Sequence, residues 1–191
     1  MHLDDERQSA QHNFERLAAS IPPRLSERED RFASQIELSK ISSSKKLESL
    51  YSFMNELYGF ALKYTPCKKG CSYCCHYSIT VCEIEIAHIE KHAKIKRKKE
   101  FLNKKNFHGY PCPFLEQGIC SIYDARPFVC RKHVVLTSTN LWCNTELCND
   151  EEFPILQFTN IDKAFHHIRR ESESFNIYDI RQVFCRSMSS K

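Results

Sequence analysis

The middle of the chain contains two short runs in which cysteine recurs at close intervals. The first reads Cys67-Lys68-Lys69-Gly70-Cys71-Ser72-Tyr73-Cys74-Cys75. The second begins at Cys112-Pro113-Phe114-Leu115, continues through Gly118-Ile119-Cys120, and ends with Tyr123-Asp124-Ala125-Arg126-Pro127-Phe128-Val129-Cys130-Arg131. The chain has eleven cysteines, and seven of them lie in these two runs. Because clustered thiols form either metal sites or disulfides, the remaining sequence has to distinguish the two chemistries.

Two observations favour a metal. The first residues, Met1 to Arg7, are acidic, whereas a secretory signal peptide begins basic and then becomes apolar. We therefore expect a cytoplasmic location, where thiols stay reduced. An odd number of cysteines also leaves at least one thiol outside any set of disulfides. The sequence thus predicts an iron–sulfur cluster or one to two zinc ions.

The predicted metal ligands are the cysteines of the two runs: Cys67, Cys71, Cys74, Cys75, Cys112, Cys120 and Cys130. Four cysteines satisfy either a tetrahedral zinc ion or an iron–sulfur cluster, so seven suggest two sites, or one site with spare thiols. The spacing Cys67-x3-Cys71-x2-Cys74 is similar to the motif of radical S-adenosylmethionine enzymes, although a long helix before it predicts a different fold. The side chains of Cys74 and Cys75 diverge if the backbone is extended, so they could serve different metals.

Several nearby residues have less certain roles in the sequence. Cys82 and Cys185 are expected to be small buried side chains, and Cys143 and Cys148 are better candidates for a further role. His76 and His133 are each more typical of hydrogen-bonding histidines than of ligands. Arg126 and Arg131 could offset the charge of thiolates, pair with Asp124, or hold the carboxylate of a cofactor.

Hydrophobic periodicity predicts a mainly α fold, with helical flanks around an irregular, cysteine-rich metal-binding centre. We expect an N-terminal helical region over 1–65, the cysteine-cluster region over 66–133 and a C-terminal helical region over 134–191, together forming one domain. The strongest helical signal is an apolar stripe at i, i+3, i+4 and i+7 that ends before Pro66: Leu47, Leu50, Tyr51, Met54, Leu57, Tyr58 and Ala61.

Other helices are predicted from local signals. One helix ends at Pro22, and a second begins at a capping box of Ser26 and Glu29. A third runs over 83–105, and a fourth is capped by Asn160. A last helix holds Phe175 to Phe184, and Val134 to Leu136 form a short strand.

Charge and hydropathy indicate which classes of binding partner can be expected. The net charge is +4, and the one basic run, Lys94 to Lys99, contains no interleaved aromatic or glycine-rich element, so a nucleic-acid partner is not expected. No apolar stretch reaches the roughly 18 residues of a membrane span. A protein substrate stays open, as does the oligomeric state.

Taken together, the two runs resemble the YkgJ-type cysteine-cluster family, which is described as zinc- or iron-chelating. That pattern has a run ending in Cys-Cys, then Cys-Pro-Phe-Leu, a Gly-x-Cys turn, Tyr-x-x-Arg-Pro and Cys-Arg. The seven cysteines match it, as do Tyr123, Arg126, Pro127 and Arg131, over about residues 66 to 133. The resemblance implies metal or iron–sulfur binding, and in its flagellin lysine N-methylase members it implies a [4Fe–4S] cluster with S-adenosylmethionine.

Three functions follow from this pattern. The first is a metal-binding protein whose metal joins two loops. The second is a methyltransferase acting on protein lysine, in which Arg126 and Arg131 bind S-adenosylmethionine; with four glycines the chain has no visible glycine-rich nucleotide loop. The third is a redox sensor or interaction module with a structural metal. Whether the protein is an enzyme stays open at this point.

Overall fold

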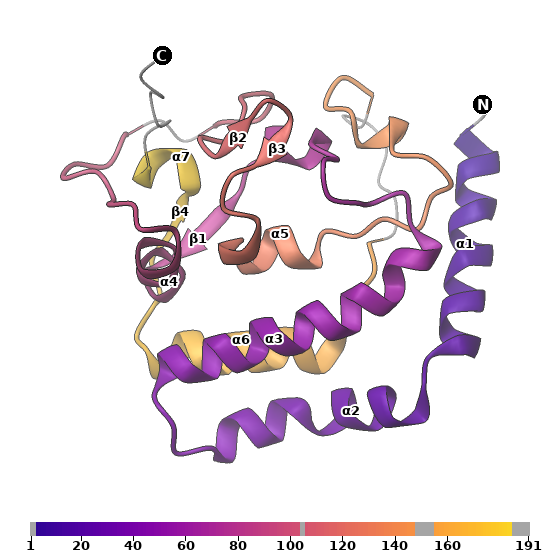
Figure 1. Ribbon diagram of the computed structural model, residues 1–191, viewed down its shortest axis with the longest axis horizontal. Helices are drawn as coiled ribbons and strands as arrows, with labels where there is room; N and C mark the ends of the chain where they lie inside the picture. The colour runs from indigo at the N-terminus through magenta and orange to yellow at the C-terminus, as the bar shows by residue number, and fades with distance from the viewer. Residues whose placement is uncertain (1–2, 104–105, 148–154, 185–191) are drawn as a thin grey trace.

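A computed structural model of the chain describes residues 3–103, 106–147 and 155–184. The fold is mainly helical, as predicted. Figure 1 shows a lower layer of long helices, namely α2 (Pro23–Leu38), α3 (Ser43–Ala61) and α6 (Thr159–Glu171), with α1 (Leu3–Ser20) standing along one side. The cysteine-bearing loops lie above α3, together with the short elements of the middle and the C-terminal part of the chain.

Helix α3 is the centre of the molecule. All seven residues of the predicted apolar stripe are buried in it, which confirms the stripe as core. α6 packs against both α2 and α3, and Phe32 of α2 meets Phe53 of α3 with ring centroids 4.6 Å apart. Helix α5 (Phe128–Lys132) packs on the other side of α3, and its Phe128 stacks on Phe165 of α6 at 4.0 Å. Because α5 carries Cys130, this packing ties a predicted ligand to the core.

Two predicted helix caps are wrong. Helix α2 begins at Pro23 and not at the expected Ser26, because proline fits the first turn of a helix, where its missing N–H has no partner to lose. The carboxylate of Glu29 instead accepts hydrogen bonds from Asn160 N at 2.8 Å and Asn160 Nδ2 at 3.2 Å. Helix α6 begins at Thr159, with Phe158 at the N-cap position, so Asn160 lies in the first turn and its own backbone N–H is satisfied by Glu29 from another helix.

Helix α4 (Glu83–Ala93) is much shorter than the predicted 83–105. Lys94 adopts a left-handed conformation with φ of 55°, which ends the helix. The chain then turns back, and Arg97 forms ion pairs with Glu83 and Glu90. Lys98 donates from its backbone N to Val183 O and from Nζ to Arg181 O. Part of the basic run is therefore engaged within the protein.

The C-terminal region also differs from prediction. Ile177–Asp179 form β4, antiparallel to β1 (Thr80–Cys82), and a short helix α7 (Ile180–Val183) follows where one long helix was predicted. A second pair consists of β2 (Leu115–Glu116) and β3 (Ile119–Cys120). The predicted strand at Val134 to Leu136 appears only as a bridge between Val135 and Ile155. Short 3₁₀ turns complete the fold: η1 (Leu62–Tyr64), η2 (Tyr73–His76), η3 (Tyr123–Ala125) and η4 (Leu141–Cys143).

The buried apolar residues form two clusters. One joins α1, α2, α3, α5 and α6, and the other joins β1, α4, the second cysteine loop and α7. Both clusters contain residues of the second cysteine run, Phe128 in the first cluster and Cys112 and Phe114 in the other, so this run joins the two cores. Within the described residues, none of the helices combines the length and apolar character that a membrane crossing requires.

Candidate metal centre

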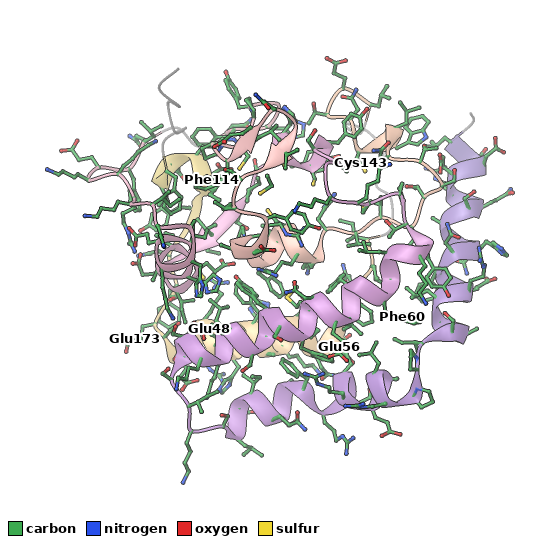
Figure 2. The ribbon with its side chains drawn as sticks, viewed as in Figure 1. Glu48, Glu56, Phe60, Phe114, Cys143 and Glu173 are labelled. Atoms are coloured by element: carbon green, nitrogen blue, oxygen red, sulfur yellow. The ribbon has the colours of Figure 1, made fainter. Side chains whose placement is uncertain are left out.

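The structure brings all seven predicted cysteines to two adjoining cavities. A larger cavity of about 280 Å³ is lined by Cys67, Cys71, Cys74 and Cys130. A smaller one of about 60 Å³ is lined by Cys71, Cys74, Cys75, Cys112, Cys120 and Cys130. Figure 2 shows sulfur atoms gathered between the β2–β3 hairpin and α5. The seven cysteines are free thiols.

The first run is shaped by turns that follow directly on α3. Cys67 N donates to Thr65 Oγ1 at 2.9 Å, and Cys71 N donates to Lys68 O at 3.0 Å. Gly70 has a φ of 94°, a conformation that glycine adopts without steric cost and that reverses the chain before Cys71. The 3₁₀ turn η2 then carries Cys74 and Cys75. Divergence was expected only for an extended backbone, and here the two cysteines lie in a 3₁₀ turn, with the Cys74 side chain hydrogen-bonded to Cys75. Both line the smaller cavity, and Cys74 also lines the larger one.

The second run is built as a hairpin joined to the first run. Cys112 N donates to Cys75 O at 2.8 Å, which links the two loops through their backbones. Gly118, with a φ of 78°, makes the turn between β2 and β3, and Leu115 pairs with Cys120. The predicted turn at Gly118 is confirmed, and it returns Cys120 to the cavity that Cys112 also lines.

The cysteines divide into two groups, which we name by position. The inner set is Cys75, Cys112, Cys120 and Cys130, which all line the smaller cavity. Burial raises the pKa of Cys112 to about 12, and raises the pKa of Cys120 and Cys130, with further increases from the neighbouring thiols of the set. The outer set is Cys67, Cys71 and Cys74, which line the larger cavity. The division is not complete, since Cys71, Cys74 and Cys130 line both cavities.

Cys75 differs electrostatically from the rest of the inner set. The Cys74 thiol donates a hydrogen bond to the Cys75 sulfur, which lowers the pKa of Cys75 to about 7 and raises the pKa of Cys74. The guanidinium groups of Arg181 and Arg126 lower the pKa of Cys75 further. A metal must displace the protons of its cysteine ligands, and Cys75 gives up its proton most readily among the inner four.

The two arginines predicted near the metal occupy different places. Arg131 is buried and donates from Nε to Arg126 O at 2.8 Å and from Nη1 to Asn55 Oδ1 at 2.6 Å, and its Nη2 donates to Asp124 O. Its guanidinium is thus engaged with the protein. Arg126 lies over the ring of Tyr123 at 3.7 Å, lines both cavities, and has a buried Nε without a hydrogen-bond partner. Arg131 also lines the larger cavity, but Arg126 lines both and keeps an unpartnered Nε.

A buried arginine that the sequence analysis did not single out joins the two loops. Arg181 Nη2 donates to three main-chain oxygens, and Nε donates to a fourth: Cys75 O, Tyr77 O, Tyr110 O and Pro111 O. Its Nη1 contacts both carboxylate oxygens of Asp179 at 3.0 and 3.1 Å. The only local signal was Asp179 three residues before Gln182, which forms a capping box for α7.

A buried carboxylate supports the other side of the centre. Glu85 accepts hydrogen bonds from Tyr51 Oη at 2.9 Å, Phe128 N at 2.7 Å and Cys82 N at 3.0 Å. The Cys82 thiol also donates to Glu85, at 3.3 Å. Burial raises the pKa of Glu85, and these four donors oppose that rise. Cys82 thus lies in a buried network outside the two cavities, in agreement with its expected exclusion from the ligands.

The two candidate histidines and the cysteines outside the two runs differ in how close they lie to the cavities. His133 lines the larger cavity and has a buried Nε2 without a hydrogen-bond partner, whereas His76 lines neither cavity. Asn140 Nδ2 donates to Cys71 Sγ at 3.3 Å, so the segment before Cys143 borders the outer set. Figure 2 labels Cys143, whose carbonyl accepts from Tyr77 Oη at 2.7 Å. Cys148 and Cys185 lie outside the described residues.

Comparison with known families agrees with this geometry. Residues 66–149 match the model of the family named CxxCxxCC, described as a putative zinc- or iron-chelating domain. A comparison with curated proteins and with solved structures found no match. The matched segment contains both cysteine runs, η3, α5 and η4. Residues 66–149 are therefore similar to the CxxCxxCC family of putative zinc- or iron-chelating domains, the family type that the two cysteine runs resemble.

Proposed function

We propose that the protein binds an iron–sulfur cluster through the inner set, Cys75, Cys112, Cys120 and Cys130, and a second metal group at the outer set. The observation that carries the proposal is the meeting of cysteines from two separate loops around one cavity, which is lined by all four of the inner set and also by Cys71 and Cys74. Four thiolates are the ligand set of a cubane cluster and also of a structural zinc ion.

The spacing of the sulfurs supports a cluster over a single zinc ion. Around tetrahedral zinc with bonds of about 2.3 Å, thiolate sulfurs stand about 3.8 Å apart. Among the described residues, the one group of three metal-ligand side chains whose donor atoms lie within 4.8 Å of one another contains no cysteine. In a cluster each thiolate binds a separate iron, so the sulfurs lie further apart. The cavity of about 60 Å³ also has room for several atoms of water size.

The charges around the inner set suit an anionic group. Arg126 lines its cavity, and the Arg181 guanidinium contributes to the lowered pKa of Cys75. Both cations are held by the fold, since Arg181 is buried and Arg126 lies over Tyr123. Fixed positive charge offsets the negative charge that a thiolate-bound cluster carries. We further propose that the protein works in a reducing compartment, where free thiols persist.

Anaerobic purification tests the proposal directly. We expect a brown protein with broad visible absorbance that contains iron and acid-labile sulfide, because iron–thiolate centres are chromophores. A colourless protein that contains stoichiometric zinc would contradict the iron–sulfur cluster and show that the same cysteines bind zinc. A protein that carries neither metal, and whose folding is unchanged by a chelator, would contradict metal binding altogether.

A second candidate function is suggested by the larger cavity. There the three cysteines of the outer set leave a metal with an open coordination position, and Arg126 offers an unpartnered Nε. These features fit a bound amino-acid-type group, so we carry the S-adenosylmethionine-dependent lysine methyltransferase as the alternative. The cofactor would supply the methyl group, and Arg126 would bind its carboxylate.

Calorimetry with S-adenosylmethionine tests the alternative. Metal-loaded protein should bind the cofactor, and Arg126→Met should weaken binding by roughly 10-fold or more, because it removes a charge-assisted hydrogen bond. Arg28→Met is the matched control, since Arg28 also lies over an aromatic ring, that of Phe53 at 4.2 Å, but far from the cysteines in the fold. If the loaded wild-type protein does not bind the cofactor, the methyltransferase alternative fails while the metal proposal stands.

A further inference from the structure

A second group of metal-ligand side chains lies between α3 and α4, outside both cysteine cavities. It consists of Glu48 on α3 and of His88 and His92 on α4. One donor atom from each residue lies within 4.8 Å of the other two. His92 Nε2 is 3.4 Å from Glu48 Oε1, and the two imidazole ring centroids are 4.2 Å apart. Figure 2 shows Glu48 on the part of α3 that lies nearest to α4.

We propose that Glu48, His88 and His92 form a zinc site that is separate from the cysteine centre. Two histidines four residues apart on one helix face place their rings side by side, and a carboxylate from a second helix completes three ligands. Imidazole and carboxylate ligands suit zinc, and three protein ligands leave a fourth position for water or another donor. The site would connect α3 to α4 in the way that the cysteine centre connects the two loops.

The surrounding residues hold His88 in place. Its ring meets that of Tyr51 edge to face at 5.0 Å, and Tyr51 Oη is fixed by its hydrogen bond to Glu85. A histidine oriented in this way gives the site one ligand that loses little freedom on binding.

One contact competes with the metal. Lys91 Nζ donates to Glu48 Oε1 at 2.8 Å, the same oxygen that faces His92. The Lys91 side chain is 63% exposed and that of Glu48 37%. An ion pair so exposed is weak, so a bound divalent cation can displace the ammonium or use the second carboxylate oxygen.

Zinc titration of the metal-loaded protein tests the inference. After excess metal has been removed, calorimetry with Zn²⁺ should show one further equivalent bound by the wild-type chain. His92→Gln should weaken that binding by roughly 100-fold or more, since even the loss of a residue that only supports a ligand costs 10- to 100-fold. His92 is exposed, so this variant is expected to fold normally. His166→Gln, an exposed histidine on α6, is the matched control and should bind as the wild type does.

Nuclear magnetic resonance of the histidine rings gives an independent readout. Adding Zn²⁺ should move the ring signals of His88 and His92 and leave those of His166 in place. Equal zinc affinity for the wild type and His92→Gln would overturn the inference, and so would stoichiometric binding that leaves both ring signals unchanged. Neither result would bear on the cysteine centre, whose metal is loaded beforehand.

Discussion

Replacement of Arg181 by methionine should remove most of the bound metal and strongly destabilise the centre of the protein. The guanidinium satisfies four main-chain oxygens from both cysteine loops and pairs with a carboxylate that is itself buried, that of Asp179. Methionine fills a similar space but donates no hydrogen bond. Breaking a buried ion pair by removing one partner costs about 3–5 kcal/mol, and unsatisfied buried carbonyl groups add to this. Metal content per chain and the midpoint of urea unfolding measure the effect.

Two further variants separate the causes of that loss. Arg181→Lys keeps the charge beside Asp179, but an ammonium cannot match the planar fork of donors, so we expect an intermediate loss of metal and stability. Arg170→Met, on the exposed face of α6, should leave both properties within about 0.5 kcal/mol of the wild type. Retention of full metal content and stability by Arg181→Met would show that the two loops hold together without this residue.

Local patterns predicted the helical part of the fold. The apolar stripe from Leu47 to Ala61 predicted α3, because burial of one helix face repeats every three to four residues in the sequence. Pro22 likewise predicted the end of α1. These features depend on residues within a few positions of one another, so a single sequence contains the information.

The wrong predictions share a physical cause. β4 forms because Ile177 to Asp179 pair with β1, about one hundred residues earlier, and no nearby residue encodes that pairing. Lys94 takes a left-handed conformation in which the following chain packs on α7, an arrangement that depends on the folded partner. The cap expected from Asn160 was likewise replaced by Glu29 of another helix. Contacts distant in sequence overrode the local preference in each case.

The candidate site was predicted only in part for a related reason. Its cysteines are visible in the sequence because metal ligands cluster at short spacings, and the structure brings all seven together. The supporting residues, Arg181, Asp179 and Glu85, lie outside the runs and reach them through the tertiary fold. The arginines next to the cysteines were easier to identify; Arg126 lines both cavities and Arg131 only the larger one.

Serine substitutions in the two cysteine sets should have different effects if the centre has two metal groups. Cys67 lines only the larger cavity, so Cys67→Ser should remove the outer metal and leave the inner one bound. Cys112 lines only the smaller cavity and joins the loops through its backbone N–H to Cys75 O. Cys112→Ser should therefore remove the inner metal and also lower stability, because metal binding at a site built from two loops is coupled to folding. Metal analysis together with thermal unfolding measures both effects.

Cys130 provides the sharpest test of this division, since it lines both cavities and is anchored in the core through α5. Cys130→Ser should reduce both metal groups, whereas Cys82→Ser, which preserves a donor to Glu85 away from the cavities, should reduce neither. If Cys67→Ser and Cys112→Ser each remove all of the metal, the seven cysteines bind a single shared metal centre, and the inner and outer sets do not bind separate metal groups. If Cys67→Ser removes none, the outer cysteines are spare thiols beside a four-cysteine site. The intermediate outcome, partial and different losses, is the one that the separation of the two cavities predicts.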